Sequence, residues 1–207
     1  EYMRAHNIST PHHLQAHFLQ RVNRLIRKRG RMMIGWDEIL YGGLPEGATV
    51  MAWRGHKKVL EAGAAGAPIV VANGDALYLD HWQGPKLPDE QVKGDGTVVT
   101  LEEMYRYHPL AGLSAKQQNR VVGMQGQMWT HVARETREIH LQVFPRLLAI
   151  AESAWLPEGE KNFVDFNRRI GRHSARLTAL GVSYWVDRSV STASLNRTRV
   201  VIKRGGR

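Results

Sequence analysis

The sequence predicts an α/β fold in which short parallel strands are covered by helices. Four short segments are apolar along their length rather than alternating in polarity, at residues 32–36, 48–53, 69–72 and 120–125. Such continuous apolar segments are typical of strands that are buried on both faces. Segments with helical periodicity lie between them, the order typical of a parallel sheet. A complete (β/α)₈ barrel needs eight strands and about 250 residues. The 207 residues therefore form either a small open sheet or part of a barrel.

The first helix is predicted from its start signal and its apolar spacing. Thr10 followed by Pro11 is a cap residue with proline at the first helical position. Apolar residues then recur at helical spacing until Gly30 stops the run. The apolar face is expected to consist of Leu14, Phe18, Val22 and Leu25.

Three further helices carry equally local signals. Residues 100–103 form a capping box at the start of one helix. A longer apolar segment over residues 135–154 contains Pro145, so we expect the helix to kink or break there. The last helix starts at the cap residue Asn162 and ends at Gly181.

Length and composition predict one domain over residues 1–187 and a basic tail or linker over residues 188–207. Hydrophobic residues make up 43% of the chain, enough for one sizeable core. No run of about 18 apolar residues is present, so neither a transmembrane helix nor a membrane partner is expected. No signal-peptide pattern is visible. The absence of cysteine excludes disulfides and thiolate metal sites, which fits a reducing cytosol or a disulfide-free secreted bacterial protein.

The chain is basic, with a formal charge of +10 from 29 Lys and Arg against 19 Asp and Glu. Such a balance allows nucleic-acid binding. The alternative is that these charges cover the solvent faces of helices. No aromatic-rich nucleic-acid motif accompanies them, so we expect no nucleic-acid partner.

Aromatic and polar side chains follow the predicted strands at the point where each strand ends. They are Trp36, Trp53, Tyr78, Asp80, Trp129 and His131. A tryptophan at a strand end is commonly core packing, but the carboxyl ends of parallel strands meet at one edge, where ligands bind. Aromatic faces stack on the C–H faces of a sugar, and Asp and Tyr bind its hydroxyls. The pattern therefore favours a carbohydrate pocket.

Five motifs carry a resemblance to a known family. In chain order they are "GWDEIL", "VMAWRG", "NGDALYLD", "GMQGQMWTH" and "FPRLLAIAESAW". Over roughly residues 1–185 they closely resemble the second half of the catalytic domain of β-N-acetylhexosaminidases, glycoside hydrolase family 20. The resemblance implies the C-terminal half, strands 5–8, of a (β/α)₈ TIM barrel. It also implies removal of terminal non-reducing GlcNAc or GalNAc from β-linked glycans by substrate-assisted retaining catalysis. The histidines show no metal-ligand spacing and no Gly-rich phosphate loop follows a strand, so neither a metal nor a cofactor is expected.

Asp37 and Glu38 look like a catalytic acid pair, but the resemblance argues against that role. The family's Asp-Glu pair follows the fourth strand in a His-x-Gly-Gly-Asp-Glu type motif, and nothing like it occurs in this chain. The acid pair is therefore expected upstream of these residues. Asp37 and Glu38 are expected to be carboxylates at a helix N-terminus, stabilised by the helix dipole.

The resemblance also implies roles for the strand-end residues. Tyr78 would donate to the acetamido oxygen and stabilise the oxazolinium, and Asp80 would accept from the outer hydroxyls. Trp36, Trp53 and Trp129 would form the walls.

His131 stands where the family usually has a glutamate that binds O4. Either it shifts selectivity or weakens sugar binding, or it lies outside the pocket while a neighbour takes over O4. Arg146 and Glu152 are expected to be paired structurally or exposed rather than catalytic, because an outer helix carries them.

A half barrel leaves open which partner completes it. The upstream half of the barrel, or a second copy of the chain, would cover its open edges. The alternative function is a non-catalytic carbohydrate-binding or half-barrel assembly module that lacks the acid pair. Members of the family are often exported in bacteria, which favours a periplasmic or secreted location over a cytoplasmic one.

Overall fold

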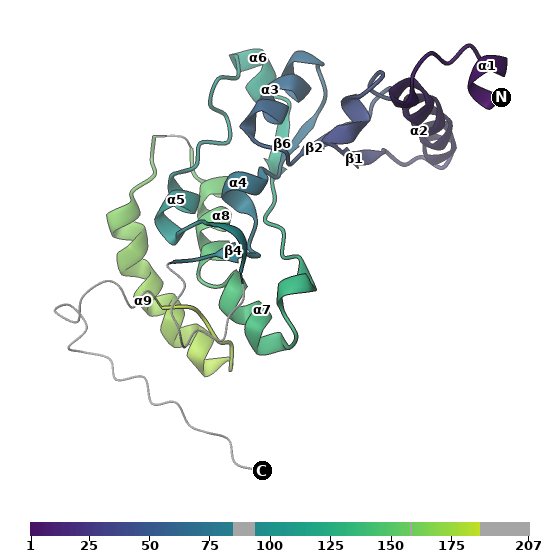
Figure 1. Ribbon diagram of the computed structural model, residues 1–207. Coiled ribbons are helices and arrows are strands. Elements are labelled where there is room, and N and C mark those ends of the chain that lie inside the picture. Colours follow the sequence, from purple (N-terminus) through teal and green to yellow (C-terminus); the bar gives the residue numbers. More distant parts are fainter. Residues whose placement is uncertain (85–93, 158, 187–207) are drawn as a thin grey trace.

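The computed structural model describes residues 1–84, 94–157 and 159–186, and a parallel sheet lies at its centre (Figure 1). Within these residues the sheet has four strands in the order β1-β2-β3-β6. The strands are β1 (Ile34–Trp36), β2 (Thr49–Ala52), β3 (Ile69–Val71) and β6 (Val121–Met124). The predicted strands and their parallel pairing are therefore confirmed. The predicted tail, residues 188–207, lies outside the described residues.

Parallel register brings the carboxyl ends of the strands to one edge of the sheet. Trp36 at the end of β1 is opposite Met51 of β2, and Val71 at the end of β3 is opposite Met124 of β6. Whatever follows each strand therefore begins at the same edge, which we call the carboxyl edge.

The core lies around the two central strands. The side chains of Val50 and Ala52 in β2 and of Ile69 and Val71 in β3 are fully buried. The edge strands differ from the prediction of strands buried on both faces, because Ile34 in β1 is 56% exposed. Val122 in β6 is likewise 65% exposed. An apolar sequence alone does not distinguish an edge strand from a central one, since burial depends on the neighbouring strand.

The helices follow the local start and stop signals closely. In chain order they are α1 (Tyr2–Ala5), α2 (Pro11–Arg27), the 3₁₀ turn η1 (Asp37–Leu40), α3 (His56–Ala64), α4 (Gly74–Leu77), α5 (Leu101–Arg106), α6 (Ala115–Gln118), the 3₁₀ turn η2 (Thr130–Val132), α7 (Thr136–Val143), α8 (Arg146–Trp155) and α9 (Phe163–Ala179). Thr10 caps α2 and Asn162 caps α9. The capping box of α5 is formed, and the predicted break at Pro145 separates α7 from α8.

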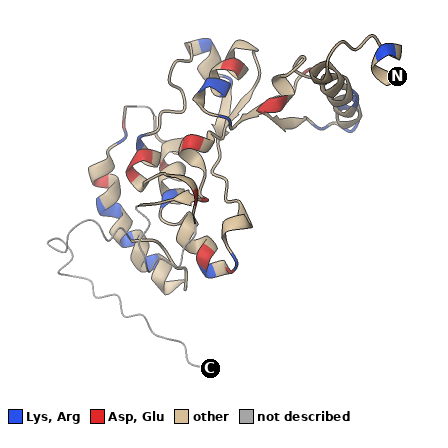
Figure 2. Ribbon diagram, in the orientation of Figure 1, with Lys and Arg blue, Asp and Glu red and all other residues tan. Residues whose placement is uncertain are grey.

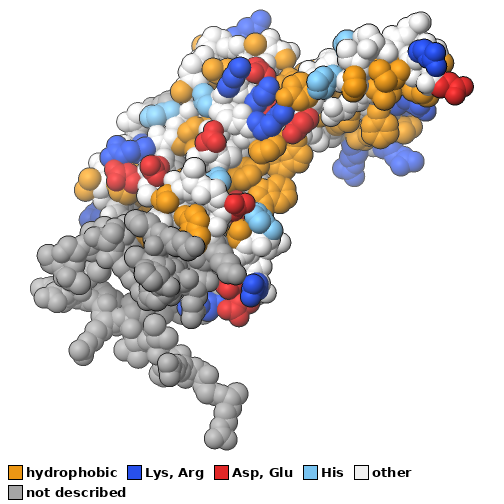
Figure 3. Space-filling view, in the orientation of Figure 1, with side chains coloured by type: hydrophobic (Ala, Val, Ile, Leu, Met, Phe, Trp, Pro, Cys, Tyr) orange, Lys and Arg blue, Asp and Glu red, His pale blue; other side chains and the backbone are white. Residues whose placement is uncertain are grey.

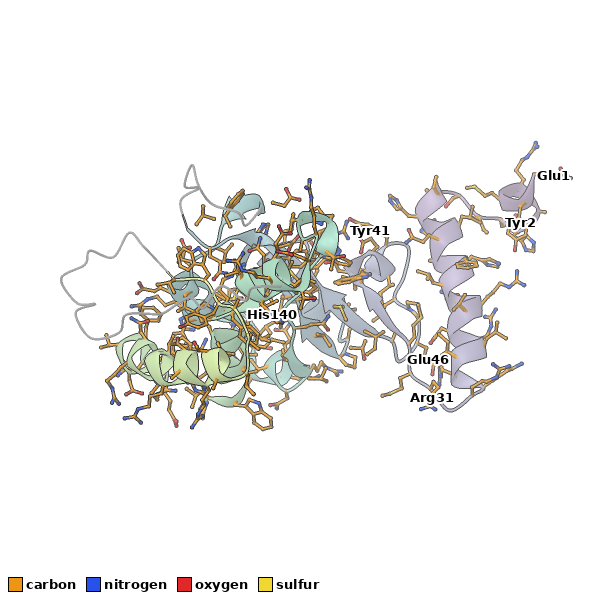
Figure 4. All side chains as sticks on the ribbon, turned by 90° about the horizontal axis from the view of Figure 1, so that it is seen from below. Glu1, Tyr2, Arg31, Tyr41, Glu46 and His140 are labelled. Atoms are coloured by element: carbon orange, nitrogen blue, oxygen red, sulfur yellow. The ribbon has the colours of Figure 1, made fainter. Side chains whose placement is uncertain are left out.

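Helix α2 stands to one side of the sheet and packs against the loop before β2 (Figures 1 and 4). Asn23 donates to the carbonyl of Glu46 at 2.9 Å, and Arg27 forms an ion pair with the Glu46 carboxylate at 2.5 Å. The predicted apolar face is partly wrong, because Phe18 and Leu25 are 62% and 64% exposed. A second row of side chains on α2, which includes the buried Asn23, makes the closer contacts, and the other two members of the predicted row are partly buried.

Two very short strands were not predicted from the sequence. β4 (His81–Trp82) pairs in parallel with β5 (Asp95–Val98). The backbone N–H of Asp95 donates to the carbonyl of Asp80 at 2.8 Å. This pairing brings residues from two segments of the chain next to each other, beside the carboxyl edge.

Charged side chains are spread over several helices. Figure 2 shows Lys and Arg on α2, α3 and α9, and Asp and Glu on α3 and α9 as well as on other elements. This distribution fits charged helix surfaces better than a single basic face. Among the residues that the structure describes, no helix has the length and apolarity needed to cross a membrane.

Candidate functional site

Four aromatic rings, from the end of β1 and from the segments that follow β2, β3 and β6, form a closed ring of contacts. The centroid of Trp36 lies 6.4 Å from that of Trp53 and 6.0 Å from that of Trp129. Tyr78 completes the ring, at 6.2 Å from Trp53 and 6.3 Å from Trp129. These distances lie in the range of interacting aromatic pairs. We call this group of four rings the aromatic box. Figure 3 shows hydrophobic side chains gathered near the middle of the face that it presents.

A cavity of about 500 Å³ opens beside the aromatic box. Trp53, Tyr78 and Trp129 line it on the apolar side. Asp80, Asp95 and His131 also line it and form what we call the polar cluster. Its size is that of a small-molecule site, and it combines flat apolar walls with a few hydrogen-bonding groups.

Tyr78 is the buried member of the aromatic box, with 8% of its surface exposed. Burial raises the pKa of its phenol above the ordinary value, and the nearby Asp80 carboxylate adds to the rise, while a hydrogen bond from Trp129 opposes it. The phenol therefore stays protonated at neutral pH, and Tyr78, which lines the cavity, keeps a hydroxyl that can donate a hydrogen bond.

Asp80 is a buried carboxylate with spare acceptor capacity. It is 4% exposed, and its Oδ1 atom has no hydrogen-bond partner among the described residues. Burial raises its pKa, an effect that its own backbone N–H and the nearby His81 and His131 partly offset. A buried acceptor without a protein partner is costly to stability, and such a cost is typical of a group that receives a ligand's hydroxyl.

Arg146 fixes the backbone on both sides of Asp80. Its guanidinium is fully buried and donates to the carbonyl groups of Leu79, His81, Val99 and Gln142. Burial lowers the pKa of Arg146 to about 9, so the side chain still carries its charge at neutral pH. Of the two expectations for Arg146, the structural role is confirmed and exposure is wrong.

Asp37 and Glu38 hold Trp53 in the aromatic box. Asp37 is fully buried, and its Oδ2 atom accepts from the backbone N–H groups of Trp53 at 2.8 Å and Arg54 at 2.9 Å. Its Oδ1 atom pairs with the Arg54 guanidinium at 2.5 Å. Glu38 accepts from the indole N–H of Trp53 at 3.2 Å. Both lie in the first turn of η1, as expected, but their side chains bond to the next loop rather than to their own helix end.

His131 lines the cavity rather than lying outside it. Its Nε2 atom is 2.9 Å from Oδ2 of Asp95. This hydrogen bond and the Gly96 N–H hold the pKa of the Asp95 carboxyl below its usual value. Asp95 was not among the residues selected from the sequence, because it lies in a short polar strand without an apolar pattern.

Asp80, Asp95 and His131 are also the kind of group that can hold a metal ion. One donor atom from each lies within 4.8 Å of the others. The hydrogen bond between Asp95 and His131 already engages one potential ligand atom of each of these two residues. The arrangement therefore fits the binding of hydroxyl groups better than a metal centre.

The fold and the cavity define a parallel α/β protein with a small-molecule site at the carboxyl edge of its sheet. Residues 1–158 match the model of glycosyl hydrolase family 20, catalytic domain. The chain belongs to this family, as the sequence motifs predicted.

Individual relatives agree with the family match. The chain is 37% identical to a beta-hexosaminidase of Porphyromonas gingivalis over 186 aligned residues. This alignment covers 89% of the chain and 24% of the relative. A beta-N-acetylhexosaminidase of Cellulomonas fimi is 25% identical over 179 residues, which cover 81% of the chain and 34% of the relative. The chain thus spans about a quarter to a third of these relatives.

Solved structures show the same fold. The chain superposes on the family 20 exo-β-N-acetylglucosaminidase from Vibrio harveyi, solved in complex with N-acetylglucosamine, with a TM-score of 0.80 and 26% identity. The match covers 89% of this chain and 29% of that one. The chitobiase of Flavobacterium johnsoniae matches with a TM-score of 0.72 and 28% identity over 87% of this chain and 26% of that one. The predicted TIM-barrel class, with parallel strands and outer helices, is therefore supported.

Proposed function

We propose that the full-length protein is a β-N-acetylhexosaminidase that removes terminal non-reducing GlcNAc or GalNAc from β-linked glycans. The observation that carries the proposal is the closed aromatic box beside a cavity that Tyr78 and Asp80 also line. The family match and the relatives' names support it.

The proposed mechanism is substrate-assisted and retaining. The acetamido oxygen of the substrate attacks the anomeric carbon, and the acetamido methyl lies in the aromatic box, where burial is worth about 1 kcal/mol and water is excluded. Tyr78 donates a hydrogen bond to the attacking oxygen, and this bond strengthens as the oxazolinium forms. Asp80 accepts from an outer hydroxyl, most simply that on C6.

The acid and the group that orients the acetamide come from outside these 207 residues in this proposal. The chain supplies strands 5–8 of the barrel, and an Asp-Glu pair upstream supplies the proton for the leaving oxygen. Exposed apolar side chains on both edge strands, Ile34 and Val122, are what neighbouring strands would cover. Those strands come from the upstream half of the barrel or from a second copy of the chain.

The second candidate is a non-catalytic carbohydrate-binding or assembly module. It is favoured by one observation, the presence of the aromatic box in a chain without the His-x-Gly-Gly-Asp-Glu type motif. The two functions differ in whether the full-length protein turns over substrate.

The test is hydrolysis of p-nitrophenyl N-acetyl-β-glucosaminide by the full-length protein and by the isolated 207-residue chain. We expect turnover by the first, and binding of N-acetylglucosamine without turnover by the second. Tyr78→Phe should lower kcat/KM roughly 10²–10³-fold, the usual cost of one lost donor to a developing charge. Tyr184→Phe, which removes a phenol hydroxyl that lies 3.5 Å from Thr178 on α9, is the matched control. Turnover by the isolated chain would contradict the proposed place of the acid.

A further inference from the structure

Asp95 is held firmly at the mouth of the cavity although its carboxylate is exposed. Its backbone N–H donates to Asp80, and its carbonyl lies 2.8 Å from Nδ1 of His81. Its Oδ1 atom accepts from the N–H of Gly96 at 2.7 Å, and its Oδ2 atom pairs with His131. Four contacts therefore fix one exposed aspartate, more than a solvated surface carboxylate needs.

The two aspartates of the polar cluster offer complementary acceptors to one ligand. Asp80 is buried and keeps Oδ1 without a partner among the described residues. Asp95 is solvent-facing, with 63% of its side chain exposed, and is already oriented by His131. Their backbones are hydrogen-bonded to each other. A ligand that fills the cavity therefore meets two carboxylates from different segments at the same end.

The polar cluster and the aromatic box line one cavity. His81 links the two groups, because its ring stacks on Tyr78 at 6.1 Å while its Nδ1 atom lies against Asp95. An N-acetylhexosamine whose acetamide lies in the aromatic box turns the far side of its ring, with the hydroxyls on C4 and C6, away from the box. GlcNAc and GalNAc differ only in the direction of the hydroxyl on C4.

We propose that Asp95, oriented by His131, binds the hydroxyl on C4 and sets the preference between gluco and galacto substrates. This inference rests on the proposed function and adds a residue to it. Hydrogen bonds to charged acceptors are stronger than those to neutral ones, so a carboxylate at this point discriminates between the two directions of one hydroxyl. His131 is a positioning residue, since its Nε2 atom holds Oδ2 of Asp95.

The test uses the full-length protein with gluco- and galacto-configured p-nitrophenyl N-acetylhexosaminides. Asp95→Asn should lower kcat/KM for the preferred epimer at least about tenfold and move the ratio between the two epimers towards one. His131→Glu should also lower it, because two carboxylates about 3 Å apart repel each other.

The double variant separates a specific role from a general one. A glutamate at position 131 can place its carboxylate near the position of Nε2, so Asp95→Asn combined with His131→Glu moves the acceptor from position 95 to position 131 instead of removing it. We expect this variant to recover kcat/KM and the epimer preference to within about threefold of wild type. The thermal midpoints should be unchanged throughout, because both side chains are more than half exposed.

Glu102→Gln is the matched control, since it neutralises an exposed carboxylate paired with Arg106 on α5. An unchanged epimer ratio in Asp95→Asn, or a double variant no better than Asp95→Asn, would overturn the assignment of Asp95 while the wild-type enzyme remained active. An inactive wild-type protein would overturn the proposed function itself, and this inference with it.

Discussion

The cavity and the corner where α5, α8 and α9 meet hold carboxylates in opposite ways, Asp80 being buried and Glu152 having 16% of its side chain exposed. In the corner, Glu152 accepts from the Arg169 guanidinium at 2.6 and 2.7 Å and from the Tyr105 hydroxyl at 3.0 Å. These bonds hold the pKa of Glu152 below its usual value. In the cavity, burial raises the pKa of Asp80, which keeps an acceptor without a protein partner. Both oxygens of the Glu152 carboxylate have protein partners, whereas one oxygen of the Asp80 carboxylate has none among the described residues.

The aromatic rings also differ between the two regions, being closely stacked in the corner and more widely spaced at the cavity. In the corner, Tyr105 and Phe166 stack at 4.5 Å and are 1% and 2% exposed. In the aromatic box the centroids are 6.0–6.4 Å apart, and Trp129 is 45% exposed. Close stacking stabilises the fold, whereas wider spacing beside a cavity leaves aromatic surface for a ligand.

Arg146 should show the largest effect on stability, because α8 joins the two regions and Arg146 lies at its start. Arg146→Ala removes the donor from four carbonyl groups, three of them in buried hydrogen bonds, and buried carbonyl groups are costly to leave unpaired. We expect the free energy of unfolding to fall by about 3–5 kcal/mol, measured by urea denaturation. Arg172→Ala, at an exposed position on α9, is the control. A loss below about 1 kcal/mol would show that the hydrogen bonds from Arg146 to these four carbonyl groups contribute little to stability.

Asp37→Asn tests the support of the aromatic box. The asparagine side chain has the shape of the aspartate, but one of its two oxygens is replaced by an NH₂ group. The Arg54 guanidinium and two backbone N–H groups need acceptors at this place. We expect a loss of about 2–3 kcal/mol, the worth of hydrogen bonds to a buried charge, and an altered environment for Trp53. The free energy of unfolding and the tryptophan emission measure the two effects. Glu38→Gln, which changes a partly exposed neighbour, should cost less than about 1 kcal/mol, and an equal loss in both variants would contradict this account.

Sequence reasoning found the parts of this molecule that local patterns encode. Caps at Thr10 and Asn162 and the break at Pro145 depend only on neighbouring residues, and each is present. The aromatic box was predicted from one further rule, that parallel strands end at the same edge. Trp36 and Trp129 are far apart in sequence, yet their rings lie 6.0 Å apart.

What sequence reasoning missed depends on distant partners. Asp95 lies in a strand of four exposed residues, and only its pairing beside Asp80 places it at the cavity. The burial of Arg146 depends on carbonyl groups more than 40 residues away in sequence, such as that of Val99. The outward face of α2, with Phe18 exposed, depends on what packs against that helix. None of these follows from periodicity or from a short motif.

Glu152→Gln sharpens the comparison of the two carboxylates. The folded-state pKa of Glu152 is lowered, so its stabilisation is complete above the unfolded pKa of about 4.3 and is lost as pH falls through the folded pKa. We expect the variant to lose about 1–2 kcal/mol at pH 7 and to approach wild type in acid. Urea denaturation between pH 3 and pH 7 measures the difference. Tyr105→Phe is a comparison variant that removes two hydrogen bonds, one to Glu152 and one from the Asn162 N–H, but keeps the charge of Glu152. A difference that does not change with pH would contradict the role of the charge.

Trp129→Ala should have the smallest effect on stability and a clear effect on ligand binding. The ring is 45% exposed and packs loosely, with neighbouring centroids at 6.0 and 6.3 Å, so the free energy of unfolding should change by less than about 1 kcal/mol. Binding of N-acetylglucosamine, measured by calorimetry, should weaken about tenfold or more, because the ligand loses one wall of its site. Trp155→Ala, on the 88% exposed tryptophan of α8, is the matched control and should change neither quantity. If Trp129→Ala cost as much stability as a core truncation and left binding unchanged, the aromatic box would be a second hydrophobic core, and the contrast between the two regions would disappear.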